Sequence, residues 1–174
     1  EMSSQQREFY TQLQTQLAIE IEAELKSSTN KQLTANNILT KLLRLSQITS
    51  GYLKWDAQVD TDGNVTQGDI QHLDKNPKLE ALEEIHKAKK DTDKTLVWTN
   101  WIPALKLISE RLTKEGIDHV TYYGGTSEND RIDAERRYNQ DPKCKVWLSN
   151  PACGGVGLDL WGHIPEWVGS DKDH

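Results

Sequence analysis

The sequence is poor in cysteine, and its only two cysteines, Cys144 and Cys153, lie nine positions apart. No pair of residues has the spacing of a metal site. The five histidines are scattered, and no two of them stand at a ligand-like offset. Because no secretory signal is present, a disulfide is not expected. The sequence therefore predicts free thiols, no metal site and a cytoplasmic protein.

Long apolar runs and excess positive charge are missing as well. No segment approaches the roughly 18 apolar residues that a membrane-spanning helix requires, so no membrane partner is expected. The 21 lysines and arginines are outnumbered by 27 acidic residues, which gives a net charge of −6. Since a self-sufficient nucleic-acid-binding domain is usually basic, this balance argues against strong autonomous DNA binding. A weak and local DNA contact remains compatible with it.

Two nucleotide-binding motifs are also absent from the sequence. It has no phosphate loop of the form Gly-x-x-x-x-Gly-Lys-(Ser/Thr) and no Asp-Glu-x-His motif. A complete phosphate site is therefore not expected, and a small nucleotide-binding regulator is poorly supported.

The first 73 residues form a predicted helical lead-in. Apolar residues recur every fourth position over 3–27, which predicts one long helix. A second helix is predicted over 34–48, ended by Gly51 in the left-handed cap position. The turn signal at 60–64 makes residues 52–73 either a hairpin, pairing 53–59 with 65–73, or a mobile insertion.

From Asn76 onward, helices and short apolar strands alternate. Strands are predicted at 94–99, 117–123 and 145–149, and helices at 77–90, 103–115 and 127–140. Strands separated by single helices predict a parallel sheet with right-handed crossovers. We therefore expect an α/β fold, with the domain boundary near residue 73. Trp98 and Trp147 lie within predicted strands and are expected in the core.

The order of three strand-to-loop segments is similar to that of a known family. Lys94–Trp101 resembles motif IV of Swi/Snf-type helicases of superfamily two, and Tyr122–Ser127 resembles the next conserved turn of that family. Ser149–Leu160 resembles motif V, a strand followed by a glycine-rich loop and Gly-Leu-Asp-Leu. The lead-in segments Met2–Tyr10 and Leu43–Gly51 also resemble the family. The resemblance covers residues 2–162 and is weakest over 52–73.

This resemblance implies a RecA-like parallel sheet flanked by helices, preceded by an α-helical N-terminal lead-in. The family's motif VI is not found, and the stretch 162–174 matches nothing expected there. The lobe over 74–174 is therefore expected to be incomplete, either truncated or ended abnormally. The phosphate loop and the acidic metal motif belong to the family's first lobe, which is the expected missing partner.

The resemblance also implies a nucleotide-binding set after the third strand. A loop rich in glycine lets the backbone approach a ligand closely. An aspartate beside such a loop could contact the sugar of a nucleotide or orient a neighbour across the cleft. The alternative is a strand-to-helix turn that needs glycine for its geometry only. The expected nucleotide-binding residues are Gly154, Gly155, Gly157 and Asp159.

A second set is expected to contact the DNA backbone. In open α/β sheets, ligands bind at the carboxyl ends of the strands, where amides and hydroxyls can hold phosphates without reading bases. The alternative is helix capping, since Thr126 or Ser127 would cap the next helix in any case. The basic face formed by Arg131, Arg136 and Arg137 could equally be solvated. The expected DNA-binding residues are Thr99, Asn100, Gly124, Gly125, Thr126, Arg131 and Ser149.

By resemblance, the parent protein is an ATP-dependent DNA helicase or translocase, a hydrolase that uses ATP and Mg²⁺. This chain is expected to supply half of the ATP cleft and part of the DNA contacts, to carry no catalytic residue and to bind neither cofactor tightly alone. The alternative is a degenerate helicase lobe that acts as a protein-interaction scaffold. The sequence leaves the oligomeric state and the pathway open. It also leaves open whether the protein is nucleoid-associated or works in a host cytoplasm.

Overall fold

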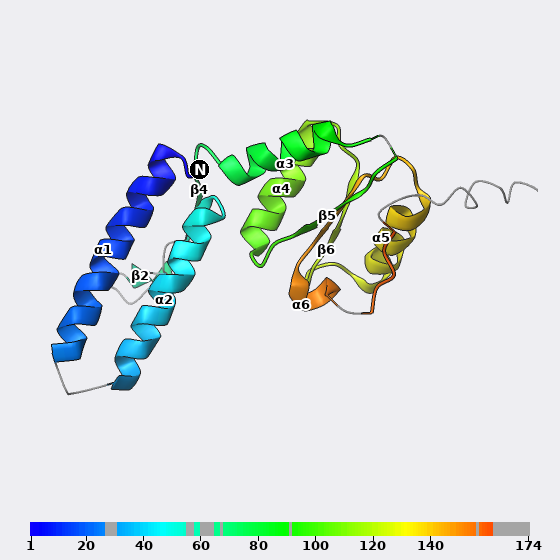
Figure 1. Cartoon of the computed structure of the whole chain (residues 1–174). Helices are drawn as coiled ribbons and strands as arrows, with labels where there is room; N and C mark the ends of the chain where they lie inside the picture. Colours follow the sequence, from blue (N-terminus) through cyan, green and yellow to red (C-terminus); the bar gives the residue numbers. More distant parts are fainter. Residues whose placement is uncertain are drawn as a thin grey trace, which may run out of the picture. The chain divides into compact units, whose positions relative to one another are not determined.

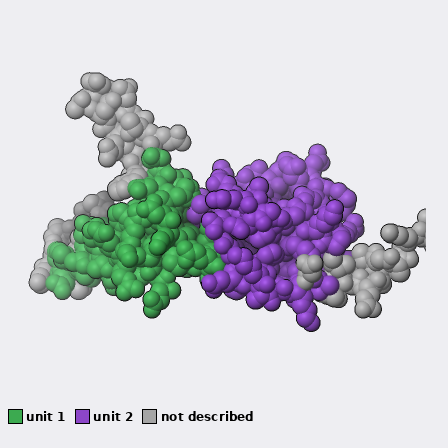
Figure 2. Space-filling model, turned by 90° about the horizontal axis from the view of Figure 1, so that it is seen from above, with its two compact units in different colours: residues 1–81 green, residues 82–174 purple. Residues whose placement is uncertain are grey.

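A computed structural model describes residues 1–26, 31–54, 58–59, 65–66, 68–90, 92–155 and 157–161. The predicted turn at 60–64, Val156 of the glycine-rich loop and the unmatched stretch 162–174 lie outside the described residues. The chain divides into two compact units, residues 1–81 and 82–174, which Figure 2 colours separately. The two units are taken in turn.

Two long helices dominate the first unit. Helix α1 spans Ser4–Lys26 and helix α2 spans Lys31–Thr49, and the two pack side by side as a hairpin (Figure 1). Leu17 of α1 is buried, and so are Leu45 and Ile48 of α2. Leu42, also on α2, keeps 49% of its surface exposed.

Short antiparallel strands follow the helices. Strand β1 (Tyr52–Lys54) pairs with β4 (Ile70–His72), and β2 (Gln58–Val59) pairs with β3 (Val65–Thr66). The described strands thus pair as in the hairpin, which was one of the two alternatives that the sequence left open for 52–73. Gly51 precedes it with a φ of 90°, the left-handed conformation expected at the end of α2. A Cβ at Gly51 would lie 2.1 Å from the Asn76 Nδ2 atom, so only glycine fits there.

The second unit is built around a three-stranded parallel sheet. Helix α3 (Pro77–Ala88) runs across the unit boundary and leads into it. The elements β5 (Thr95–Trp98), α4 (Ile102–Lys114), β6 (His119–Tyr122), α5 (Glu128–Gln140), β7 (Val146–Ser149) and α6 (Pro151–Gly154) then alternate along the chain. The strand order is β5-β7-β6, so the middle strand is the last of the three. The α/β fold with a parallel sheet is therefore confirmed.

Helices cover both faces of the central strand. All four residues of β7 are buried, and Figure 1 shows α4 and α5 on opposite sides of the sheet. Under α5, Trp147 is fully buried and stacks on Tyr122, with ring centroids 5.0 Å apart. Tyr138 meets Trp147 edge-on at 5.7 Å, and burial raises the pKa of Tyr138 to about 12. The predicted core position of Trp147 is confirmed.

Trp98, in contrast to Trp147, is not buried. Its surface is 41% exposed, and Leu96 on the same strand is 43% exposed. Both residues pair in register with β7, but β5 lies at the edge of the described sheet and α5 packs on β6. The core prediction for Trp98 is therefore wrong, because a short apolar run does not reveal whether its strand is central or at an edge.

A buried lysine fastens the start of β5 to the end of α5. The Lys94 ammonium donates hydrogen bonds to the carbonyls of Tyr138 and Asp141, the second at 2.9 Å. It also lies over the Tyr138 ring, 5.1 Å from the centroid. Burial lowers the pKa of Lys94. Because carbonyls at the end of a helix lack partners within it, this lysine caps α5.

The burial of the sheet predicts unequal costs for two leucine truncations. Leu148→Ala opens a cavity in the core and should cost about 2–5 kcal/mol of unfolding free energy. Leu96→Ala removes the same atoms from a half-exposed position and should cost about 1 kcal/mol or less. Urea unfolding of the whole chain, followed by far-ultraviolet circular dichroism, measures both. Equal losses would contradict the assignment of β7 as the central strand.

Candidate functional site

All three parallel strands end level with one another. Trp98 and Tyr122 both pair in register with Ser149, so the carboxyl ends of β5, β6 and β7 meet at one edge. The connections that leave this edge carry the motif-like segments. The predicted residues Thr99, Asn100, Gly124, Gly125, Thr126, Ser149, Gly154 and Gly155 therefore lie within three neighbouring connections, and β7 runs through the middle of them.

Asn150 joins these three connections. Its side-chain Nδ2 donates to the Asn100 carbonyl at 3.0 Å, and its backbone amide donates to the Tyr122 carbonyl at 3.2 Å. Its Oδ1 accepts from the Ala152 amide at 2.9 Å, which caps the short helix α6. One residue thus ties the loop after β5, the end of β6 and the loop after β7 together.

Ser149 supports the same junction from below. It is fully buried, and its hydroxyl donates to the Tyr122 carbonyl at 2.8 Å. A Cβ at Gly154 would lie 2.3 Å from the Ser149 hydroxyl oxygen and 3.4 Å from the Trp98 ring. The Ser149 side chain therefore holds the loop in place and is not part of the exposed surface. Gly154, also buried, acts through close packing.

The turn after β6 is fixed by its own hydrogen bonds. The Thr126 hydroxyl accepts from the Tyr123 amide at 3.1 Å, and the Ser127 hydroxyl caps α5 by accepting from the Asp130 amide at 3.2 Å. Gly125 is exposed, and a Cβ there would lie 2.7 Å from the Tyr123 ring. Gly124 is exposed too, and its nearest neighbour would be the Cys153 sulfur at 3.9 Å. The turn thus presents exposed backbone beside the glycine-rich loop.

Arg131 of α5 forms hydrogen bonds to this turn. Its Nε donates to the Thr126 carbonyl at 3.1 Å, and its Nη2 donates to the Tyr123 carbonyl at 3.2 Å. The guanidinium also lies over the Tyr122 ring, 5.3 Å from the centroid. In this arrangement Arg131 positions the loop. Arg136 and Arg137 are engaged with Asp133 and Asp118, so the three arginines of α5 do not form an unpaired basic face.

Gly155 and Gly157 of the glycine-rich loop require glycine for different structural reasons. A Cβ at Gly155 would lie 2.6 Å from the Pro151 carbonyl oxygen, so glycine is required for α6 to end there. Gly157 has a φ of 79°, a conformation that other residues rarely adopt, and no atom of the described residues would lie within 4 Å of a Cβ there. Both are exposed and leave backbone accessible at the loop.

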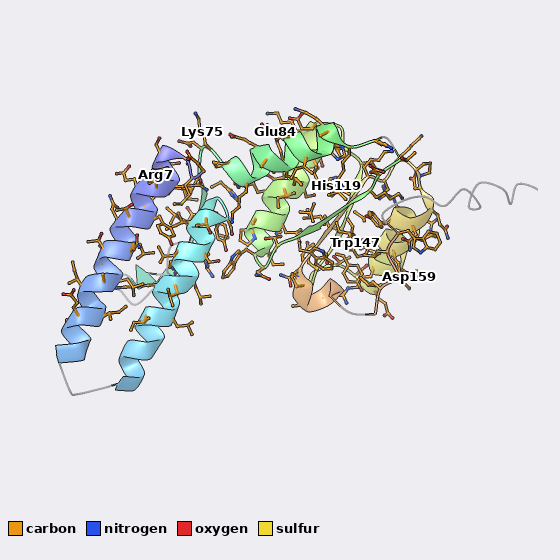
Figure 3. The ribbon with its side chains drawn as sticks, in the orientation of Figure 1. Arg7, Lys75, Glu84, His119, Trp147 and Asp159 are labelled. Carbon is orange, nitrogen blue, oxygen red and sulfur yellow. The ribbon has the colours of Figure 1, made fainter. Side chains whose placement is uncertain are left out.

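The segment after this loop is held by an asparagine of α5. The Asn139 Nδ2 donates to the Asp159 carbonyl at 2.7 Å, and its Oδ1 accepts from the Trp161 amide at 3.1 Å. These two bonds fix the backbone on either side of Leu160. The Asp159 residue itself is exposed, and Figure 3 shows it beside α5. Its carboxylate is therefore open to a ligand or to a second protein.

Sequence reasoning did not single out Asn150 or Asn139. For Asn150 a signal existed, since an asparagine before a proline is typical of an N-cap followed by the first helical residue. For Asn139 no local pattern was available, because both of its bonds reach a segment about 20 residues away.

Two possible features are not found in the described part of the chain. No helix there has the length and apolar content needed to cross a membrane. No group of three or more His, Cys, Asp or Glu side chains is placed to hold a metal ion within the described ranges.

The fold and the loops at its carboxyl edge define a RecA-like α/β lobe. Residues 77–162 match the model of the helicase conserved C-terminal domain. An uncharacterized ATP-dependent helicase of Schizosaccharomyces pombe is 37% identical over 82 residues, which are 47% of this chain and 8% of that protein. The chain thus matches only a small part of this curated relative.

Solved structures of helicase-type proteins have a fold similar to that of this chain. The C-terminal domain of a Sulfolobus solfataricus SWI2/SNF2 ATPase matches with a TM-score of 0.66 at 21% identity, covering 93% of this chain and 65% of that one. The core of the ATPase in complex with double-stranded DNA matches with a TM-score of 0.65 at 19% identity, covering 93% of this chain and 31% of that one.

Residues 77–162 thus match the family of helicase conserved C-terminal domains, and the fold of the chain is that of the C-terminal domain of the similar SWI2/SNF2 ATPase.

The bonds of Asn150 predict different effects for two substitutions. Asn150→Ala loses both the cap of α6 and the bond to Asn100, and should cost about 1–3 kcal/mol of unfolding free energy. Asn150→Asp keeps an acceptor for the Ala152 amide but has no donor for the Asn100 carbonyl. We expect it to cost less and to speed amide hydrogen exchange mainly at residues 99–101. Exchange at residues 99–101 that stays as slow in both variants as in the unchanged chain would contradict the bridging role.

Substitutions at two of the exposed glycines, Gly155 and Gly124, are expected to have different effects on stability. Gly155→Ala forces a Cβ against a backbone carbonyl, so α6 must shift and the thermal midpoint should fall. Gly124→Ala meets only an ordinary contact and should leave both the midpoint and the amide spectrum of residues 150–155 nearly unchanged. Thermal unfolding and two-dimensional NMR spectra test this. A disturbed spectrum for Gly124→Ala alone would overturn the steric assignment.

Proposed function

We propose that this chain is the second motor lobe of an ATP-dependent DNA helicase or translocase. In this role it contributes one side of the ATP cleft and part of the DNA track, and it does not turn over ATP alone. The observation that carries the proposal is the junction at Asn150. It brings the three motif-like connections of the sheet to one edge, with exposed backbone on each.

The DNA track would use the loops after β5 and β6. Asn100, Gly124 and Gly125 are exposed, while Thr99 and Thr126 bond amides within their own loops. Backbone amides and small polar side chains can hold phosphates without reading sequence. The DNA complex of the similar Sulfolobus solfataricus ATPase core is compatible with this assignment. Because the chain carries a net charge of −6, we expect the lobe alone to bind DNA weakly.

The nucleotide would be met by the loop after β7. Gly155 and Gly157 present accessible backbone, and the exposed Asp159 carboxylate could accept hydrogen bonds from a sugar. These residues fit the sugar side of a nucleotide and offer no cationic cradle for its phosphates. The phosphates and Mg²⁺ would therefore be held mainly by residues of a partner lobe. Because the sequence has no phosphate loop of its own, we expect this half-site to be inactive alone.

The DNA assignment predicts a salt-dependent affinity that responds to one added charge. Binding of a labelled duplex should weaken steeply between about 50 mM and about 200 mM salt. Asn100→Asp places a carboxylate beside the phosphates and should weaken binding about fivefold, the equivalent of about 1 kcal/mol. Fluorescence anisotropy measures the affinity.

Gln12→Glu is the matched control, because it adds the same charge at an exposed position of α1 in the other unit. It should leave the affinity nearly unchanged. Equal effects of the two substitutions would reject the loop after β5 as a DNA contact. Robust ATP turnover by the purified chain would reject the half-site assignment.

A second candidate function is a protein-interaction scaffold. It is favoured by four large apolar side chains that are exposed on the helical hairpin of the first unit, namely Ile19, Leu39, Leu42 and Leu43. Tight binding to a protein partner together with no DNA affinity would favour this role over that of a motor lobe.

A further inference from the structure

A depression of about 440 Å³ lies at the opposite edge of the same sheet. Its walls come from the three connections that lead into the strands: the one after α3, the one between α4 and β6, and the one between α5 and β7. Since the strands are parallel, these connections share the amino edge. The depression is therefore separate from the loops that carry the helicase-like motifs.

Its lining is rich in positive charge. Lys89, Lys90, Lys143 and Lys145 line it together with His86. Two carboxylates, Asp93 and Asp118, also line it, but Arg137 donates to both oxygens of Asp118 at 2.9 and 3.0 Å. That carboxylate is already neutralised. Among the described residues of the lining, four lysines therefore stand beside Asp93, whose carboxylate accepts from the Lys90 backbone amide at 3.4 Å, in a chain whose net charge is −6.

Hydrogen bonds within the protein do not engage all of these lysines. The Lys89 ammonium donates to the Lys94 carbonyl at 3.3 Å, and Lys94 itself caps the end of α5. Lys90 and Lys143 are exposed, and their ammonium groups make no hydrogen bond or ion pair to a described residue. Two cations at this edge thus remain available for an anion.

The positive charges of the depression also act on the imidazole of His86. The pKa of His86 is lowered, first by burial and then by the charges of Lys89 and Lys145. A bound anion would offset the lysine charges and favour the imidazolium, so it should raise this pKa. His86 therefore provides a spectroscopic probe inside the depression.

We propose that the amino-edge depression binds phosphate groups, supplied by a free polyphosphate or by a nucleic-acid backbone. Ammonium groups on flexible stems are suited to phosphate oxygens, and the depression gathers four of them around one concave surface. The nucleic-acid source rests on the proposed function and would give the lobe a second backbone contact, on the edge away from the motif loops. The polyphosphate source is independent of that function.

The test follows the His86 imidazole by NMR in the whole chain, with His86→Asn used to assign its signal. We expect sodium tripolyphosphate to shift the signal in a saturable way and to raise the His86 pKa. The double variant Lys90→Gln with Lys143→Gln should weaken this binding by about fivefold or more. Lys106→Gln, an exposed lysine of α4 outside the depression, is the control and should leave it unchanged.

A parallel titration with a short DNA duplex separates the two sources. A shift with tripolyphosphate identifies a site that free phosphates can fill, and a shift with the duplex alone identifies a backbone contact. No saturable shift with either probe, or a shift that the double variant leaves intact, would overturn the proposal. Loss of the Asn100→Asp effect on DNA affinity would instead reject the proposed function and leave a tripolyphosphate site standing.

Discussion

The junction at Asn150 is the interaction on which the carboxyl edge of this lobe depends. A parallel sheet places the ends of its strands at one edge, but it does not fix the loops that follow them. Here one side chain bonds the loop after β5 and caps α6, while its backbone bonds the end of β6. Beneath it, the buried Ser149 hydroxyl and the absence of a side chain at Gly154 close the packing. Arg131 and Asn139 then secure the neighbouring segments from α5.

The sheet separates two chemically different edges. The carboxyl edge presents glycine backbone and amides, which suits contacts that require close approach and little charge. The amino edge gathers lysines around a depression. Such a division lets an acidic chain keep a local positive field without becoming a strong general binder of nucleic acid. The Lys94 side chain lies at the amino edge as well, where it joins the start of β5 to the end of α5.

Much of the fold could be predicted from the sequence because its signals are local. Alternating apolar strands and helices, the cap at Ser127 and the left-handed Gly51 are each determined by neighbouring residues, and the structure confirms them. Burial was harder to predict. Trp98 has the pattern of a core residue but is exposed, because the strand order is set by distant segments. The hydrogen bonds of Asn139 depend on such distant contacts too, whereas those of Arg131 reach a turn only five and eight residues away.

The central claim is that the loops after β5 and β6 contact the DNA backbone. Mapping amide chemical shifts of the isotopically labelled chain during titration with a short duplex tests it directly. The account predicts shifts concentrated at residues 99–101 and 123–127, which lessen as salt is raised. Shifts confined to the helical hairpin of the first unit, or no shifts at low salt, would contradict it and make the scaffold function the better explanation.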